Sequence, residues 1–518
     1  MSEAVIPFPG EDVMAEAGHG GPVPDFVRLH AAGRPDSAAL VDASSGRRLS
    51  YGELDRELDL AVTMLRSLGV EAGSRVAALS RNSLELIVLQ LACARAGAIL
   101  APLNWRLSTA ELRALLEDCA PTLLFGDDRL AAMGKVDVPI LTPEELAGLL
   151  EKAEPAPEEP GNATLPSLML YTSGTSGRPK GVLLTEANLF ATAVNFSVIG
   201  EVSASSAFLV DSPMFHVIGM VANIRPALLM GAKIVVSGGF DPAVTLDRLA
   251  DPSLGITHYF CVPQMAEMLR SAPGFDASRL RGLKAIFTGG APHPAARIRE
   301  WLADGIPIVD GYGMTETGTV LGMPVSLSTI GRKAGSAGLL PPTLEHRLVR
   351  DDGSACAPGE AGELLLRGPN ICVGYWRNPA ETEKAFTDDG YLRTGDIARR
   401  DEDGFFYLVD RKKEMFISGG ENVYPAEIEA VLKSHPGVAE AAVVAAPDQK
   451  WGEVGHAFVL LRRDAEAGET ALRALCEQGL ARYKHPRTIR FLEEMPRTGS
   501  GKVLKAELRK LLDSPVGN

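Results

Sequence analysis

The chain has 518 residues, of which 46% are hydrophobic and 23% are charged, and its formal net charge is −14. This length exceeds what a single hydrophobic core supports, so we expect two or more domains, and the composition is that of an ordinary globular protein. The acidic balance argues against nonspecific nucleic-acid binding and against electrostatic attachment to anionic lipid.

The cysteines, the N-terminal residues and the longest apolar stretch indicate where in the cell the protein is expected. Six cysteines are scattered without a C-x-x-C pair, which indicates neither a zinc site nor a disulfide framework and fits a reducing cytoplasm. Residues 1–20 look like a loose N-terminal arm without the cationic segment of a signal peptide. The most apolar stretch, residues 86–103, is interrupted by Arg95 and Pro102, so we expect a buried helix followed by a strand and not a membrane span.

From residue 51 onward the pattern alternates amphipathic helices with apolar strands. Residues 54–68 and 84–96 predict helices, and residues 75–79 and 98–101 predict strands. This alternation indicates parallel sheets covered by helices, the arrangement of an α/β fold.

The rest of the chain divides by composition. An acidic, proline-rich linker at residues 151–162 precedes a second α/β region, which we expect at about residues 165–335. Strands with tight turns then run to about residue 410 and suggest an antiparallel piece. In the last hundred residues the pattern predicts helices at 425–434 and 469–480 and strands at 438–446 and 456–461.

The expected architecture is therefore α/β with two domains. The large N-terminal domain, residues 21–410, would contain two α/β subdomains and a small β-rich subdomain. The C-terminal domain, residues 411–518, would be a small, mobile α+β unit.

The segment YTSGTSGRPKG, residues 171–181, is the most informative part of the chain. Its glycines let the backbone approach a ligand, its amides and hydroxyls can surround an anion, and Lys180 adds a charge suited to a polyphosphate. Apolar runs at 167–170 and 181–185 predict a strand on each side of this loop. No helix pattern begins at the lysine, so the loop is not a Walker A motif. A simple mobile turn is the alternative.

Seven further segments follow this loop along the chain. They are MFHVIGM at 214–220, FTGGAP at 287–292, DGYGMTET at 310–317, YLRTGD at 391–396, DRKKEM at 410–415, SGGENVYP at 418–425 and PRTGSGK at 496–502. Most of them, taken singly, read as turns or charged surface segments. As an ordered set they supply the glycines, carboxylates, hydroxyls and lysines that a nucleotide site requires.

This ordered set resembles the motifs of the adenylate-forming superfamily, which contains acyl- and aryl-CoA ligases, firefly-luciferase-like enzymes and the adenylation domains of peptide synthetases. The chain looks most like a bacterial acyl-CoA ligase, and the resemblance covers nearly its whole length. It implies an AMP-forming acid–thiol ligase that uses ATP, Mg²⁺ and coenzyme A.

The resemblance also implies how the nucleotide is bound. Tyr312 would stack on adenine, Asp310 would accept from the adenine amino group, and Asp396 would accept from the ribose hydroxyls. Thr315 would donate to the α-phosphate, and Glu316 would be the Mg²⁺ ligand. The residues expected to bind ATP or coenzyme A are Thr172, Ser173, Gly174, Thr175, Ser176, Lys180, Gly290, Ala291, Pro292, Asp310, Gly311, Tyr312, Asp396, Arg411, Gly419 and Gly420.

The C-terminal motifs are expected to alternate at the active site. In the family, the lysine at the position of Lys502 bridges the substrate carboxylate and the α-phosphate, where a cation stabilises the pentavalent phosphorus. Lys413 matches the hinge about which the small domain turns, and Gly419 and Gly420 match the segment that lines the pantetheine channel. The expected catalytic residues are Lys502, Thr315, Glu316 and His216.

The acyl pocket is the least specified part of the site. His216 is a lone histidine in an apolar segment, and a core histidine is the alternative to a pocket residue. Other pocket candidates are Val217, Ile218, Phe260, Cys261, Gly289, Gly313 and Met314. Most of them are apolar, so we expect a monocarboxylate with an apolar body: an aryl, medium-chain or polycyclic acid.

Two alternatives stay open. The enzyme could only adenylate its acid or could load an acyl carrier protein, although the Gly419–Gly420 pair favours coenzyme A. A silent nucleotide-binding protein is the other alternative. The intact set that argues against it is Lys180, Glu316, Asp396 and Lys502. We expect a cytoplasmic enzyme without nucleic-acid partners or integral membrane association.

Overall fold

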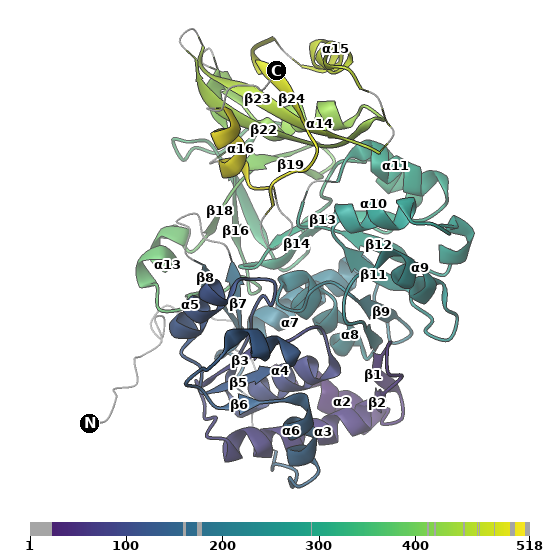
Figure 1. The fold of residues 1–518 in the computed structure, drawn as a ribbon, viewed down its shortest axis with the longest axis vertical. Helices are drawn as coiled ribbons and strands as arrows, with labels where there is room; N and C mark the ends of the chain where they lie inside the picture. Colours follow the sequence, from purple (N-terminus) through teal and green to yellow (C-terminus); the bar gives the residue numbers. More distant parts are fainter. Residues whose placement is uncertain are drawn as a thin grey trace.

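The computed structural model describes residues 23–158, 162–172, 179–291, 293–411, 414–418, 421–448, 451–463, 465, 467–480, 482–497 and 503–512. Two mixed sheets and one small antiparallel sheet are built from the N-terminal part of the chain, and the fourth sheet belongs to the C-terminal part (Figure 1). This mixed architecture, with a large N-terminal unit and a smaller C-terminal one, confirms the predicted fold class.

The first sheet has seven strands in the order β17-β8-β7-β4-β3-β5-β6. Its strands are β3 (Arg75–Leu79), β4 (Ile99–Pro102), β5 (Leu123–Gly126), β6 (Ile140–Leu141), β7 (Pro166–Thr172), β8 (Lys180–Thr185) and β17 (Gly374–Tyr375). The associated helices are α3 (Tyr51–Ser67), α4 (Leu84–Ala96), α5 (Thr109–Cys119), η1 (Asp128–Met133) and α6 (Pro143–Leu150). The middle strands are parallel, whereas β8 runs antiparallel to both β7 and β17.

The second sheet has eight strands in the order β14-β13-β12-β11-β9-β10-β1-β2. Its strands are β1 (Ala38–Asp42), β2 (Arg48–Ser50), β9 (Ala207–Val210), β10 (Lys233–Val236), β11 (His258–Cys261), β12 (Ala285–Thr288), β13 (Ile308–Met314) and β14 (Gly318–Gly322). The helices of this region are α2 (Phe26–Gly33), α7 (Glu186–Gly200), the π-helix η2 (Ile218–Ala222), α8 (Ile224–Met230), α9 (Pro242–Ala250), α10 (Pro263–Ser271), η3 (Ala277–Leu280), α11 (Ala295–Ala303) and α12 (Leu327–Arg332).

The division of strands between these two sheets differs from the expectation. A second α/β region was expected to begin at about residue 165, but β7 and β8 pair with the first sheet. Conversely, β1 and β2 lie near the N-terminus yet extend the second sheet through β10. The cause is pairing between strands that are distant in sequence, which the local hydrophobic pattern does not encode.

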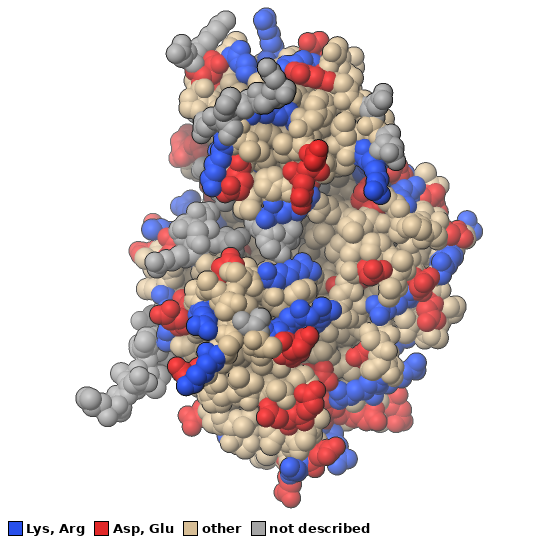
Figure 2. Space-filling model, in the orientation of Figure 1, with Lys and Arg blue, Asp and Glu red and all other residues tan. Residues whose placement is uncertain are grey.

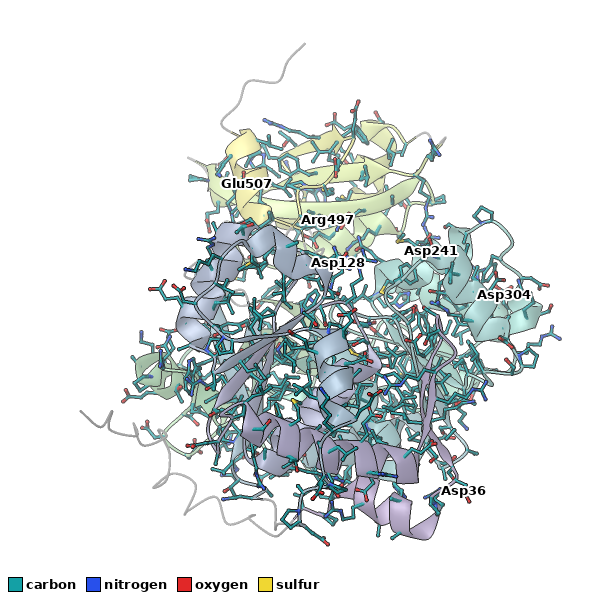
Figure 3. All side chains as sticks on the ribbon, turned by 60° about the horizontal axis from the view of Figure 1, so that its bottom comes forward. Asp36, Asp128, Asp241, Asp304, Arg497 and Glu507 are labelled. Atoms are coloured by element: carbon teal, nitrogen blue, oxygen red, sulfur yellow. The ribbon has the colours of Figure 1, made fainter. Side chains whose placement is uncertain are left out.

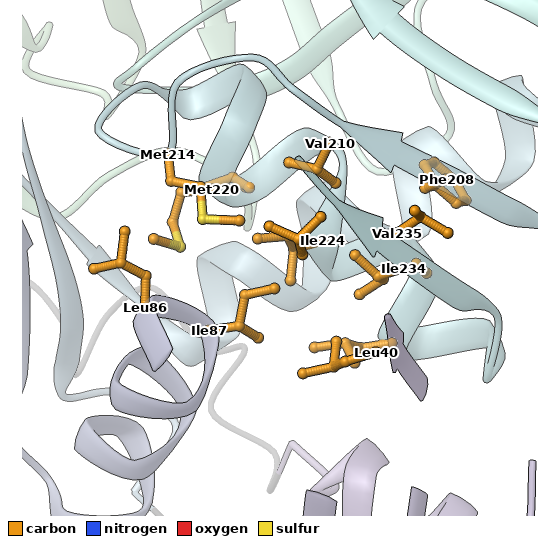
Figure 4. Close-up of a cluster of buried hydrophobic side chains, with 14 of the residues drawn as sticks. Leu40, Leu86, Ile87, Phe208, Val210, Met214, Met220, Ile224, Ile234 and Val235 are labelled. Atoms are coloured by element: carbon orange, nitrogen blue, oxygen red, sulfur yellow. The ribbon is translucent and has the colours of Figure 1, made fainter. Parts of the chain in front are cut away.

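Helix α4 explains the most apolar stretch of the sequence. It begins after the N-cap Ser83 and ends at Gly97, which adopts the left-handed conformation with a φ of 69°. Its residues are buried on most sides because it packs among β1, β4, β7 and helix α3. Figure 4 shows Leu86 and Ile87 of α4 beside Met220 and Ile224. The expected buried helix followed by a strand is therefore confirmed by α4 and β4.

The third sheet and the C-terminal sheet are smaller. The third is antiparallel, as predicted, and contains β15 (Glu345–Val349), β16 (Gly362–Arg367), β18 (Leu392–Arg400) and β19 (Phe406–Arg411), with α13 (Pro379–Ala385) between β17 and β18 in the chain. The C-terminal part contains β20 (Phe416–Ser418), β21 (Glu421–Val423), α14 (Pro425–Lys433), β22 (Val438–Asp448), β23 (Gly452–Leu461), α15 (Glu469–Gly479), η4 (Arg482–Lys484), β24 (Thr488–Leu492) and α16 (Lys505–Leu512). The helices and strands predicted for this part are confirmed.

The charged side chains are mixed on the surface visible in Figure 2, and the cysteines are not paired. Acidic and basic side chains are interspersed over the face in Figure 2, so this face carries no large patch of one sign. All six cysteines lie among the described residues and none forms a disulfide. In the described part of the chain, no helix combines the length and apolarity needed to cross a membrane.

Candidate active site

The hairpin of β7 and β8 holds the phosphate end of the candidate site. Thr172 and Lys180 are cross-strand partners at the loop end of this hairpin, so they bracket the predicted phosphate loop. The loop residues Ser173, Gly174, Thr175 and Ser176 lie outside the described residues. The predicted strands on both sides of the loop are confirmed.

Lys180 has a defined environment. Its ammonium group forms an ion pair with a carboxylate oxygen of Glu381 on α13, and it lies 5.1 Å from the ring centroid of Tyr375. Only 15% of the Lys180 side chain is exposed. Strand β17, which carries Tyr375, pairs with β8 and contacts α13. Helix α13 thus lies beside β8, as Figure 1 shows.

The β13–β14 hairpin carries the DGYGMTET segment and requires glycine at two positions. A Cβ on Gly313 would lie 2.0 Å from the carbonyl oxygen of Gly318, and a Cβ on Gly311 would lie 2.9 Å from that of Leu321. These contacts are too close for any side chain. The hairpin turn that follows places Thr315 and Glu316 between the two strands.

Glu316 is buried and accepts a hydrogen bond. Its Oε1 atom accepts from the Tyr375 hydroxyl at 3.0 Å, and its backbone carbonyl accepts from the amide of Cys372 at 2.7 Å. Burial raises the pKa of Tyr375, so its hydroxyl stays protonated as the donor. The carboxylate is thereby held in one orientation.

The donor set at Glu316 fits Mg²⁺ bound together with substrate phosphates. Within the described residues, no three His, Cys, Asp or Glu side chains gather as a metal site. A single buried carboxylate cannot hold a divalent cation alone, but Mg²⁺ is commonly bound by one or two carboxylates, water and nucleotide phosphates. Glu316 could supply that one protein ligand.

Asp310 forms a buried hydrogen-bonded group with residues of β12 and the loop after it. The Thr288 hydroxyl donates to Asp310 Oδ1 at 3.0 Å, and the same hydroxyl lies 3.1 Å from His293 Nδ1. Burial raises the pKa of Asp310 to about 8 and lowers the pKa of His293 to about 4. Gly290 and Ala291 lie just beyond Thr288, and Pro292 lies outside the described residues.

Tyr312 and Asp396 meet although they are far apart in sequence. The Tyr312 hydroxyl donates to Asp396 Oδ2 at 2.5 Å, and the carboxylate of Asp396 is buried. Asp396 on β18 is the cross-strand partner of Arg411 on β19. The side chain of Arg411 lies outside what the structure describes. The ring and the carboxylate expected for adenine and ribose are thus adjacent.

The candidate acyl pocket lies beside Gly289 and Gly290. A Cβ on Gly289 would lie 3.4 Å from the Phe260 ring, and a Cβ on Gly290 would lie 3.5 Å from Ile218 Cδ1. His216 precedes the π-helix η2, and its ring packs against Phe215 with centroids 4.5 Å apart. A π-helix is an uncommon element that is frequent at functional sites.

Cys261 differs from the expectation for the pocket. Alternate residues of a strand point to opposite faces, so Cys261 shares its face with Tyr259 and not with Phe260. Both are fully buried, and the Tyr259 hydroxyl donates to Asp211 at 3.2 Å. Burial also raises the pKa of the Cys261 thiol well above its usual value. Cys261 is therefore a core residue on the opposite face of β11 from Phe260.

The C-terminal motifs are only partly described. Lys413, Gly419, Gly420 and Lys502 lie outside the described residues. Arg497, which precedes Lys502 in the PRTGSGK segment, lies at the border of the C-terminal domain (Figure 3). With its amide oxygen turned toward Arg497, Gln264 of α10 accepts from both terminal nitrogens at 3.0 Å. This end of the lysine segment therefore meets the helix that follows β11.

Sequence reasoning did not identify four partners of the motif residues: Tyr375, Glu381, Thr288 and His293. Tyr375 is separated from Glu316 by 59 positions, and Glu381 from Lys180 by 201. No local periodicity connects residues at such separations. Thr288 was within a noted motif, but only the pairing of β12 with β13 places it at Asp310.

The sequence matches the AMP-binding enzyme family over residues 27–376 and its C-terminal domain over residues 427–502. The chain belongs to this family of adenylate-forming enzymes, which confirms the recognised superfamily and the expectation of an enzyme.

Among its relatives, an indoleacetate–CoA ligase of Aromatoleum aromaticum is 40% identical over 506 residues, which is 94% of this chain and 98% of that protein. A feruloyl-CoA synthase of an Amycolatopsis species is 37% identical over 90% of this chain and 94% of its own length. The structure of ATP-bound MatB from Rhodopseudomonas palustris aligns with a TM-score of 0.86 at 31% identity and covers 94% of this chain and 98% of that one. The apo form of MatB gives a TM-score of 0.79 with the same coverage.

Proposed function

We propose that the protein activates an apolar monocarboxylic acid with ATP, giving acyl-AMP and pyrophosphate, and then transfers the acyl group to coenzyme A, giving acyl-CoA and AMP. One connected set of contacts carries the proposal. Lys180 lies over Tyr375, Tyr375 donates to Glu316, and Tyr312 of the same hairpin donates to Asp396. A lysine, a buried carboxylate, and an aromatic ring paired with a second carboxylate thus offer partners for the phosphates, the Mg²⁺, the adenine and the ribose.

The residues act by positioning and by charge, because the substrate carboxylate is itself the nucleophile. Lys180 and the loop before it bind the outer phosphates, Asp310 accepts from the adenine amino group, and Asp396 accepts from the ribose. Glu316 would hold a Mg²⁺ ion, which would supply positive charge beside the phosphates. Lys502 bridges the carboxylate and the α-phosphate during adenylation, with Thr315 as a further donor.

Thioester formation requires a second arrangement of the domains. The small domain turns about Lys413, Lys502 leaves, and the Gly419–Gly420 segment admits the thiol of coenzyme A, whose attack on the acyl carbonyl releases AMP. The domain arrangement in the present structure supports assignment to the first, adenylating state, because this structure aligns more closely with ATP-bound MatB than with apo MatB.

The acid is proposed to be an aryl acid. Phe260 and Ile218 flank the glycines of the pocket, and the two relatives above are named for indoleacetate and for a feruloyl group. Medium-chain and polycyclic acids fit the same apolar residues. An enzyme that only adenylates, or that loads an acyl carrier protein, is the second candidate because the segment that admits the thiol is known here from sequence alone. The six free cysteines support a cytoplasmic location.

The test is a mass-spectrometric assay for thioester with ATP, Mg²⁺, coenzyme A and a panel of aryl and aliphatic acids. Parallel reactions contain hydroxylamine, which traps acyl-AMP as the hydroxamate. Acyl-CoA from an aryl acid is the expected product. Hydroxamate without acyl-CoA would favour the adenylating or carrier-loading enzyme. The absence of both products with every acid tested would refute the proposal.

A further inference from the structure

One short segment contacts both charged groups at the phosphate end of the site. This segment, residues 374–384, contains β17 and most of α13. Tyr375 donates to Glu316, and Glu381 forms the ion pair with Lys180. The segment pairs with β8 through Gly374 and Tyr375, which are the partners of Leu183 and Val182.

Helix α13 holds the Glu381 carboxylate in a fixed place. Asn378 caps the helix and its Oδ1 accepts from the backbone amide of Glu381 at 3.3 Å. Thr382 ties the helix back to β17, since its hydroxyl accepts from the amide of Tyr375 at 2.9 Å and donates to the carbonyl of Asn378 at 3.0 Å. These hydrogen bonds fix the backbone that carries Glu381, and from there its side chain reaches Lys180.

Charge and burial make the contact more than a loose surface pair. The Lys180 ammonium holds the pKa of the Glu381 carboxyl below its usual value, so Glu381 is charged at neutral pH. The exposed fractions of the two side chains are 15% for Lys180 and 33% for Glu381. Lys384 lies 3.0 Å from the other carboxylate oxygen but is 73% exposed, so water screens its contribution more strongly.

We propose that Glu381 is a resident counter-ion of Lys180 that competes with the polyphosphate of the nucleotide. Glu381 thereby lowers the affinity of the site for ATP and for pyrophosphate and assists pyrophosphate release. The inference rests on the proposed role of Lys180 in binding the outer phosphates.

The competition follows from the number of charges that one ammonium group can satisfy. A phosphate oxygen that binds Lys180 must displace the carboxylate or approach it as a like charge, and either event costs free energy. Replacing Glu381 by glutamine removes the charge, keeps the length of the side chain and leaves the cap at Asn378 in place. Affinity for the polyphosphate should then rise.

The experiment is isothermal titration of the full-length protein with magnesium pyrophosphate and, separately, with magnesium ATP. The variants are Glu381→Gln, the matched control Glu383→Gln, which removes one charge from the exposed side of the same helix, and Lys180→Met. For Glu381→Gln we expect the Kd of each ligand to fall about two- to fivefold, the size expected for a partly exposed ion pair. Glu383→Gln should stay near the parent protein, and Lys180→Met should bind more weakly.

The direction of the change in Kd shows whether Glu381 competes with the polyphosphate or supports Lys180 in binding it. A Kd that rises in Glu381→Gln, as in Lys180→Met, would mean that Glu381 supports the lysine, and a Kd that matches Glu383→Gln would mean that it has no effect; either result overturns the proposal. Equal thermal melting temperatures of the two glutamine variants exclude a folding defect as the cause. Because titration needs no turnover, the result stands apart from the acid and acceptor tests above.

Discussion

An ion pair between the domains should control how fast the enzyme makes acyl-AMP. Arg462 follows β23 in the C-terminal domain, and its Nη1 atom donates to Glu267 Oε1 of α10 at 2.5 Å. Gln264 lies one turn earlier on the same helix and meets Arg497 of the lysine segment. Helix α10 begins directly after Val262, near the acyl pocket, so it joins the pocket to the C-terminal domain.

The size of the effect follows from exposure. The side chains of Arg462 and Glu267 are 28% and 33% exposed, so the pair is partly screened and contributes about 0.5–1 kcal/mol. Arg297 lies 3.9 Å from the second carboxylate oxygen and stays to compensate Glu267 when Arg462 is neutralised. A loss of about 0.5–1 kcal/mol moves the equilibrium between domain arrangements by about two- to fivefold.

The measurement separates the two half-reactions. In Arg462→Gln we expect hydroxylamine-trapped acyl-AMP to form about two- to fivefold more slowly, while thioester formation from supplied acyl-AMP keeps its rate. The double variant with Glu267→Gln should lose no more than either single variant, since the pair is already broken. Arg463→Gln, a change of equal charge at the exposed neighbouring residue, is the control.

Two results would refute this reasoning. Equal slowing of both half-reactions by Arg462→Gln would show a general defect and not a shift between arrangements. Additive losses in the double variant would show that the two side chains act independently, whatever their distance in the structure.

Other measurements test the buried acids and the hairpin glycine. Because the pKa of Asp310 is about 8, its carboxyl is largely protonated at pH 7, so KM for ATP should fall up to about tenfold between pH 7 and 9, and Asp310→Asn should abolish this dependence. Burial raises the pKa of Asp211 to about 7, whereas the unfolded chain releases that proton near 3.8, so its contribution to the free energy of unfolding falls as pH rises from about 4 to 7. Urea unfolding of Asp211→Asn should show a smaller loss of stability over this range, and an unchanged slope would contradict the assignment. Gly313→Ala should destabilise by more than about 2 kcal/mol in urea unfolding, because its Cβ would lie 2.0 Å from a carbonyl oxygen, whereas Gly331→Ala, with 3.7 Å to the nearest side chain, should be near neutral.

Local sequence patterns were sufficient to predict single elements. Helix α3 begins with a capping box in which Ser50 and Glu53 exchange hydrogen bonds, and its apolar positions face the core, so spacing and cap agree. Helix α4 and strand β4 follow from an apolar run that is broken by a glycine. The assignment of β1, β2, β7 and β8 to sheets could not be predicted in this way, because it depends on distant pairings such as Leu40 with Ile234 and Leu100 with Leu168.

In the candidate site, too, local sequence predicts the motif residues but not their partners, because strand register decides which residues meet. Thr172 pairs with Lys180, Thr288 with Asp310, and Asp396 with Arg411, so motif residues that are apart in sequence face one another across neighbouring strands. Each strand displays its residues in alternation, and a shift of one residue would turn all of them to the opposite face. The motifs therefore predict which residues bind the nucleotide, whereas strand pairing decides which residues hold them.

Glu381 and Tyr375 show the functional consequence of that division. Neither belongs to a nucleotide motif, yet both adjoin the site because the two-residue strand β17 pairs with β8. The residues proposed to bind the nucleotide are constrained by the chemistry of ATP. The residues behind them are fixed only by packing, and they can therefore tune affinity and release without altering the reaction. Differences in phosphate affinity between members of the family should accordingly be sought at positions such as 381, where a charge can be gained or lost without disturbing a motif.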